Sequence, residues 1–321
     1  ACGDEAEVLS EMFERLSVSE LSAAQLEAHR EALAWPRDPS RLVLFPPVLP
    51  ASATSGDNAI ADNATAAEAS DPGNDAQRQA RSAAAEQLFE LASAWAEADR
   101  EGDAYRLLFQ VLAIEPQHAA TRAVLDPTLR ELTTEAGGLK VVPQSRPERT
   151  YGWGGGEWGR IDTPHFTVIG SADAAQLELV AGRLERLYAA WDLIFFEVWS
   201  PPGRLAKALR DGRALARSSV RRKHSVVLFA DRDEYLRRLQ GLAPNVETSQ
   251  GYYAPTRRQS MFFPDPSERP AALLHEVTHQ LFQERLGARS IAGERANFWV
   301  VEGIAALMES LDERGSHLTV G

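Results

Sequence analysis

Apolar residues recur at helical spacing in the first part of the chain. Residues 4–35 are rich in Ala, Leu and Glu, and their larger apolar side chains stand four or five positions apart, at Val8, Met12, Leu16, Leu21 and Leu26. Spacing of this kind gathers side chains on one side of a helix. The pattern predicts packed N-terminal helices within residues 1–45.

Residues 46–75 show no such period. The stretch "PPVLPASATSGDNAIADNATAAEASDPGND" is dense in Ala, Ser, Asp, Asn and Pro. Prolines and small polar residues interrupt helices and strands, and few large apolar side chains are present to hold the stretch on a core. We therefore predict a flexible linker over these residues.

Periodic apolar positions resume in residues 76–140. Within "AEQLFELASAWAEADREGDAYRLLFQVLAIEPQH" (85–118), one apolar face precedes Gly102 and a second follows it. This pattern resembles a tetratricopeptide repeat, a helical pair of about 34 residues with small residues where the helices touch. A plain helical hairpin is the alternative, because such repeats usually need neighbours for stability. The expected interface contains Leu88, Ala92, Trp95, Ala104, Leu108 and Val111.

Strand patterns first appear after residue 150 and then alternate with helical ones. The glycine-rich "YGWGGGEWGR" (151–160) lacks the surroundings of a phosphate-binding loop and is read as a connector. Strands are predicted at 165–171 and 224–230, two short strands within 251–263, and helices at 173–199 and 231–241. The chain is therefore predicted to be α+β, with a domain at 151–321 built on a small mixed sheet.

The next predicted helix contains the sequence "LLHEVTHQLF" (273–282). Pro270 suits the first turn of a helix and Gly287 suits its C-terminal cap, so we predict a helix from about Pro270 to Leu286.

Two histidines of this helix are spaced to share one metal ion. His275 and His279 stand four residues apart and therefore lie on the same helical face, with Glu276 one position round from the first. Catalytic zinc uses neutral imidazole ligands and a nearby carboxylate that can take a proton from bound water. The sequence predicts a Zn²⁺ site, and an ordinary helix that contains two histidines is the alternative.

A catalytic zinc usually has three protein ligands, so a third is expected. The apolar segment "NFWVVEGIAALMES" (297–310) carries Glu302 among residues that otherwise suit a core. Burying a carboxylate in such a segment is costly unless it is paired or bound to a metal. Glu302 is the favoured ligand, and the alternatives are Glu294, Glu309 and His317.

Composition limits the partners of the chain. A formal net charge of -12 argues against nucleic acid, whose binding depends on many Lys and Arg side chains. No apolar run approaches the roughly 18 residues of a membrane-spanning helix. A peptide or protein substrate is expected instead, with a protein partner for the N-terminal helices as a further expectation.

Cys2 is the single cysteine of the chain, so no internal disulfide can form. A small residue followed by Cys resembles the end of a bacterial lipoprotein signal. This resemblance implies an exported or periplasmic protein with a lipid on Cys2, and a cytoplasmic protein with a free terminal cysteine is the alternative.

Several quoted motifs together resemble one enzyme family. "HEVTH" followed by "WVVEGIA" resembles the gluzincin-type, peptidase MA-like metallopeptidases. "TPHFTVIGS", "GYYAP" and "LLHEVTHQL" are similar to the bacterial DUF1570 group of that clan, a family defined by sequence with an inferred peptidase function. The resemblance covers roughly residues 151–310.

The resemblance implies a zincin-like domain with His275, His279 and Glu302 as zinc ligands and Glu276 as the general base. It also implies that the hairpin at 251–263 lines the cleft. Some gluzincins place an acidic residue four positions after the ligand glutamate, where this chain has Ala306. The C-terminal subdomain that completes the cleft in such enzymes is not evident in this sequence.

The expected activity is zinc-dependent hydrolysis of peptide bonds. The alternative is a noncatalytic binding or scaffold protein, in which tetratricopeptide-like helices recruit partners and the metal site is vestigial.

Overall fold

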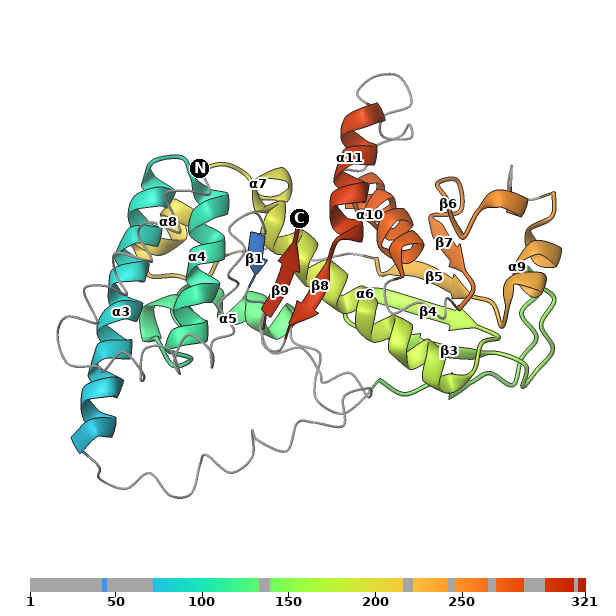
Figure 1. Cartoon of the computed structure of the whole chain (residues 1–321), viewed down its shortest axis with the longest axis horizontal. Helices are drawn as coiled ribbons and strands as arrows, with labels where there is room; N and C mark the ends of the chain where they lie inside the picture. Colours follow the sequence, from blue (N-terminus) through green and yellow to red (C-terminus); the bar gives the residue numbers. More distant parts are fainter. Residues whose placement is uncertain are drawn as a thin grey trace.

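The computed structural model of the chain describes residues 42–44, 72–132, 139–215, 222–241, 246–264, 270–285, 298–314 and 317–321. Cys2, the helices expected at 4–35 and residues 46–71 of the expected linker lie outside this part of the chain. The described residues form an α+β fold, with a group of helices at one end and a mixed sheet at the other (Figure 1).

A six-stranded sheet carries the C-terminal half. Its order is β2-β3-β4-β5-β7-β6, with β4, β5 and β7 parallel and the outer strands antiparallel to their neighbours. The strands are β2 (Val142–Pro143), β3 (Gly159–Asp162), β4 (Phe166–Gly170), β5 (His224–Leu228), β6 (Gly251–Ala254) and β7 (Gln259–Phe262). The predicted strands at 165–171 and 224–230 and the predicted hairpin at 251–263 are thereby confirmed.

Both faces of the sheet are covered, which explains why its central strands read as continuous apolar runs. On one face, Val226 of β5 joins a core with α6 (Ala174–Ile194) and α10 (Ala271–Arg285). On the other face, the next residue, Val227, packs against α9 (Arg232–Leu239) and Tyr151. The glycine-rich segment at 151–160 connects elements as expected, but it also supplies core aromatic residues.

The described helices of the helical end are α3 (Pro72–Glu97), α4 (Glu101–Ile114), α5 (Ala119–Leu132), α7 (Phe196–Trp199) and α8 (Arg204–Asp211). The helical pair expected within 76–140 is present as α3 and α4, and α5 adds a third helix. α3 begins at Pro72, inside the range predicted as linker, because proline is well accommodated in the first turn of a helix.

The interface expected between the paired helices is largely confirmed. Leu88, Ala92, Ala104, Leu108 and Val111 are fully buried in one cluster. Trp95 also packs against this cluster, but its side chain is only half-buried. Its ring lies under the guanidinium group of Arg100, 4.4 Å from the ring centroid, at the rim of the helical pair.

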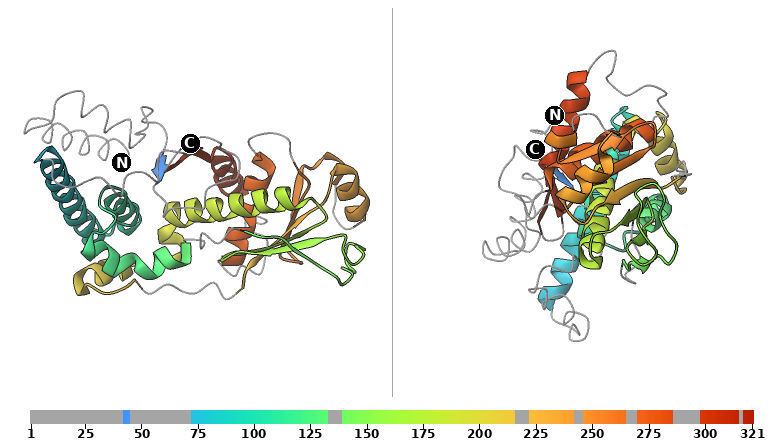
Figure 2. Two further views of the ribbon diagram at one scale, coloured as in Figure 1. Left: turned by 90° about the horizontal axis from the view of Figure 1, so that it is seen from below. Right: turned by 90° about the vertical axis from the view of Figure 1, so that its right-hand side faces the viewer.

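Two carboxylates tie α4 to α7 and α8 within the helical end. Glu197 of α7 accepts a hydrogen bond from the backbone N–H of Gly102 at 2.9 Å, and Glu101 accepts one from the N–H of Ala206 at 2.8 Å. Each carboxylate satisfies an N–H in the first turn of a helix, where no intrahelical acceptor exists. The long helix α6 then runs from this region to the sheet, as Figure 2 shows from two further directions.

A second sheet, which the sequence did not predict, joins the two ends of the described chain. Its order is β1-β9-β8, from β1 (Leu42–Leu44), β8 (Asp312–Arg314) and β9 (His317–Val320). Residues 42–44 were included in the helical range 1–45. They form a strand because Leu44 is buried in the core and the backbone pairs with β9 through Leu42↔Val320 and Leu44↔Leu318. No described helix is long and apolar enough to cross a bilayer.

Leu108→Ala should destabilise the fold by about 2–5 kcal/mol, because it removes a fully buried side chain and leaves a cavity between the paired helices. Urea denaturation followed by circular dichroism measures the loss. Trp95→Ala is the comparison variant. It should lower the free energy of unfolding by less than Leu108→Ala does, because part of the Trp95 ring is already exposed to water. A larger loss for Trp95→Ala than for Leu108→Ala would contradict this description of the interface.

Candidate metal centre

The three residues favoured as metal ligands from the sequence lie together in the structure. His275 and His279 come from α10, and Glu302 comes from α11 (Phe298–Glu309), which packs against α10. One ligand atom from each of the three lies within 4.8 Å of the other two. The helix predicted from about Pro270 to Leu286 is also confirmed, since α10 spans Ala271–Arg285.

The distances between these donor atoms suit a tetrahedral ion. The Nε2 atoms of His275 and His279 are 3.1 Å apart. Glu302 places Oε2 3.2 Å from Nε2 of His275 and Oε1 3.4 Å from Nε2 of His279. In a tetrahedral zinc site with ligands at about 2.0–2.1 Å, neighbouring ligand atoms lie about 3.3–3.4 Å apart. The three side chains are therefore spaced as ligands of one ion would be.

Glu309, one of the alternative third ligands, contacts the other ring nitrogen of His275 instead of joining the three donor atoms. Its Oε1 lies 2.6 Å from Nδ1 of His275, the ring nitrogen opposite the one that faces Glu302. A carboxylate in this position orients an imidazole and fixes which ring nitrogen is left to bind a metal. Glu294 and the side chain of His317 lie outside the described residues.

Glu276 stands beside the three donors and is held by the edge of the sheet. Its Oε2 accepts a hydrogen bond from the backbone N–H of Tyr253 in β6, at 3.0 Å. Burial raises the pKa of the Glu276 carboxyl above its ordinary value, and the negative charge of Glu302 raises it further. The hydrogen bond from the Tyr253 N–H and the electrostatic interaction with His275 partly offset this rise in the pKa of Glu276.

The pKa of the His279 imidazole is lowered, whereas the pKa of Glu276 is raised. Burial lowers the pKa of its imidazole, and His275 lowers it further, while the carboxylate of Glu302 opposes the change. A lowered pKa keeps the ring neutral at physiological pH, and the neutral ring is the form that can bind a metal.

β6 presents an edge that no other described strand covers. The carbonyl of Phe262 in β7 accepts a hydrogen bond from Phe229 N–H at 2.8 Å. The backbone N–H and C=O of Phe262 therefore face β5 and point away from β6. Gly251 faces Phe262 in the register and therefore points its own backbone groups outward. Tyr253, two residues on, does the same, as its bond to Glu276 shows.

The opposite side of α10 is fixed to the sheet by a buried polar network. Gln280 accepts a hydrogen bond from Ser260 Oγ at 2.8 Å and donates to the carbonyl of Ser225 at 3.1 Å. It also donates to Glu284 at 3.0 Å, and Glu284 in turn pairs with Nδ1 of His224 at 2.9 Å. These contacts hold α10 against the ends of β5 and β7, and hence set where its histidines stand.

Gln280 and Glu284 were not predicted as part of the site, although their spacing in the sequence gave a signal. They stand four residues apart on α10, as the two histidines do, but on another face. Burial alone would raise the pKa of Glu284. The hydrogen bond and charge of His224, together with Gln280 and Arg258, instead hold it below its ordinary value.

Comparisons with known proteins do not place the chain in a family. No family model, no curated protein and no solved structure matches it. The resemblance to gluzincin-type peptidases therefore stays a prediction, and the function has to be argued from the geometry of the site.

Glu284→Gln should destabilise the protein by about 1–3 kcal/mol at pH 7, because it removes a buried, hydrogen-bonded charge. The folded-state pKa of Glu284 is depressed, so its contribution is complete above its ordinary pKa of 4.5 and is lost as pH falls through the folded value. The difference in the free energy of unfolding between wild type and Glu284→Gln should therefore decrease as the pH falls from 5 to 3.

Urea unfolding at a series of pH values checks this expectation. Glu90→Gln, a change at an exposed glutamate on α3, serves as the control and should show no such difference at any pH. A difference for Glu284→Gln that stays constant down to pH 3 would contradict the assignment.

Proposed function

We propose that this protein is a zinc-dependent peptidase in which His275, His279 and Glu302 hold the metal and Glu276 is the general base. The observation that carries the proposal is the convergence of three donors from two helices, at spacings of 3.1 to 3.4 Å, beside a buried carboxylate that is not one of them. A structural metal site would not need the fourth group.

The donor set suits zinc. Two imidazole nitrogens and one carboxylate oxygen are the ligands of one large class of catalytic zinc sites, and three protein ligands leave a fourth position open. The lowered pKa of His279 favours ligation, and the contact between Glu309 and His275 directs the other imidazole. Both features favour metal binding over a simple cluster of ion pairs.

When bound, zinc lowers the pKa of a coordinated water and polarises a substrate carbonyl. Glu276 is assigned the proton transfers. The Tyr253 N–H fixes one oxygen of this carboxylate, and the other is assigned to take a proton from the attacking water. The raised pKa of Glu276 brings it closer to neutral pH, so the same group can afterwards donate that proton to the leaving amine.

A peptide is the substrate that the surroundings of the site favour. The outward N–H and carbonyl of Gly251 and the outward carbonyl of Tyr253 can pair with an extended chain laid along β6, in the manner of β-strand addition, while the Tyr253 N–H stays bonded to Glu276. Because Tyr253 also holds Glu276, a peptide on this edge lies next to the general base. The pairing uses only backbone groups and therefore suits peptides of many sequences.

The proposal includes a zincin-like arrangement, in which the mixed sheet packs on the helix that carries the histidines. It also includes a tetratricopeptide-like character for α3 and α4, supported by the fully buried small residues Ala92 and Ala104. A noncatalytic scaffold with a vestigial site is the competing function. The presence of Glu276 beside three intact donors favours the enzyme.

Glu276→Gln should leave zinc content and folding nearly unchanged and reduce peptide hydrolysis by about 10²- to 10⁴-fold, since it removes the proton acceptor but no ligand. Zinc content by plasma mass spectrometry and cleavage of a mixed peptide library measure the two effects. His275→Ala is the matched variant on the same helix, and it should lose stoichiometric zinc and with it the stabilisation that the bound metal gives.

A protein that carries zinc but cleaves nothing in the library would favour the scaffold. Equal cleavage by Glu276→Gln and wild type would contradict the assigned role of Glu276. Absence of zinc from wild type after loading would contradict the metal site itself.

Glu309→Ala should weaken zinc binding by about tenfold to a hundredfold, because His275 loses the carboxylate that orients its ring. Competition with a chromophoric chelator measures the affinity. Glu90→Ala makes the same charge change at an exposed position on α3 and should leave the affinity as it is. Equal affinities for the two variants would show that Glu309 does not position His275.

A further inference from the structure

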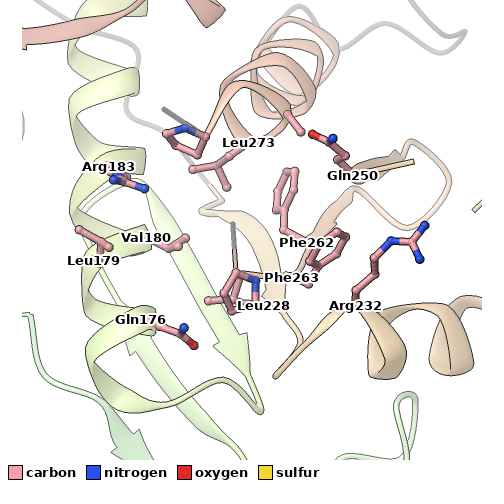
Figure 3. A pocket seen from close by; sticks show the side chains of 13 residues that line it. Gln176, Leu179, Val180, Arg183, Leu228, Arg232, Gln250, Phe262, Phe263 and Leu273 are labelled. Atoms are coloured by element: carbon pink, nitrogen blue, oxygen red, sulfur yellow. The ribbon is translucent and has the colours of Figure 1, made fainter. Parts of the chain in front are cut away.

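A cavity of about 290 Å³ opens beside the candidate metal centre. It lies between α6, the carboxyl ends of β5 and β7, and the first turn of α10 (Figure 3). Its walls are mainly apolar, and the side chains that form them include Leu179, Val180, Leu228, Phe262, Phe263 and Leu273. None of the proposed roles in zinc binding or proton transfer uses this cavity.

The cavity adjoins the two elements that form the proposed site, the helix α10 and the edge strand β6. Ala272 and Leu273 line it from α10, and they precede His275 by less than one helical turn. Gln250 lines it from the sheet side and directly precedes Gly251, the first residue of the open edge strand. A Cβ atom added to Gly251 would lie 3.6 Å from Cγ of Glu276, so the residue that follows Gln250 stands next to the proposed general base.

The size and polarity of the cavity indicate what it can accept. Pockets for small molecules have volumes of about 300–1,000 Å³, so a cavity of 290 Å³ suits one side chain better than a whole ligand. The 13 described lining residues include Arg183 and Arg232 but no Asp or Glu, in a chain of net charge -12. Among these described residues a lysine or arginine side chain would find no carboxylate partner, and burying it without one is costly.

We propose that this cavity is a specificity pocket for one bulky apolar side chain, such as leucine or phenylalanine, of a peptide bound along β6. The inference rests on the proposed peptidase function and adds the substrate class. Successive side chains of an extended peptide point to opposite faces at about 3.3 Å per residue. A residue that passes Gln250 with its side chain toward the helical face of the sheet enters the cavity, while the backbone keeps its pairing with β6.

The same geometry predicts which peptides are cleaved. At one fixed position from the cleaved bond, leucine and phenylalanine should be preferred over alanine by about tenfold or more, and lysine should be rejected. The preference belongs to one position only, because one side chain fills the cavity. Cleavage-site profiling of a mixed peptide library by mass spectrometry measures it directly.

Two substitutions fill the cavity from opposite walls at positions that are neither proposed ligands nor the proposed general base. Ala272→Trp and Leu179→Trp start from half-buried positions on α10 and α6. Each should reduce cleavage of leucine and phenylalanine peptides about tenfold and leave alanine peptides and zinc content unchanged. Ala271→Trp is the matched control, because Ala271 is the neighbouring half-buried residue and does not line the cavity.

A binding measurement separates this inference from the proposed function. Fluorescein-labelled hexapeptides with phenylalanine, alanine or lysine at each position in turn are titrated into wild type and the tryptophan variants, and anisotropy gives the affinities. Tighter binding of one phenylalanine peptide that is lost in Ala272→Trp and Leu179→Trp supports the pocket, even if wild type cleaves nothing. Affinities that do not depend on the side chain, or a cleavage profile that the two variants leave unchanged, would overturn the pocket while leaving the peptidase function standing.

Discussion

The site depends on the way α10 is fixed to the sheet. On one face of this helix, Gln280 and Glu284 are bonded to side chains and carbonyls of β5 and β7, in surroundings where an unpaired polar group would be costly. The other face carries His275 and His279 toward α11. Because both faces belong to one rigid helix, the network that satisfies the buried polar groups also sets the height of the histidines above the edge strand.

The charges gathered at the proposed metal centre favour a bound cation. Glu276, Glu302 and Glu309 surround two imidazoles, and the charge of Glu302 already raises the pKa of Glu276. Like charges at such distances oppose one another unless a positive charge lies between them. In the proposed site, a divalent ion held by Glu302 and the two histidines would supply that charge and leave Glu276 free for its proposed role in proton transfer. The orienting carboxylate, absent at Ala306, is provided by Glu309 near the end of the same helix.

The parts predicted from the sequence are those that depend on local spacing. His275 and His279 follow from the helical period, and Glu302 follows from the cost of a carboxylate in an apolar segment. The contact of Glu309 with His275, the pairing of Leu42–Leu44 with the last strand and the cavity beside Leu273 join residues that are distant along the chain. The spacing of apolar and polar residues along the sequence does not predict contacts between such distant residues. Trp95 was placed in the interface by its helical spacing, but spacing alone does not show whether a side chain lies at the centre or at the rim of an apolar face.

Diffraction at the zinc absorption edge from crystals of the zinc-loaded protein tests the central claim most directly. The account predicts one anomalous peak between His275, His279 and Glu302, with ligand atoms about 2.0–2.2 Å from it and Glu276 outside that distance. A peak elsewhere, or zinc-soaked crystals in which Glu302 turns away from both histidines and no peak is present, would contradict it.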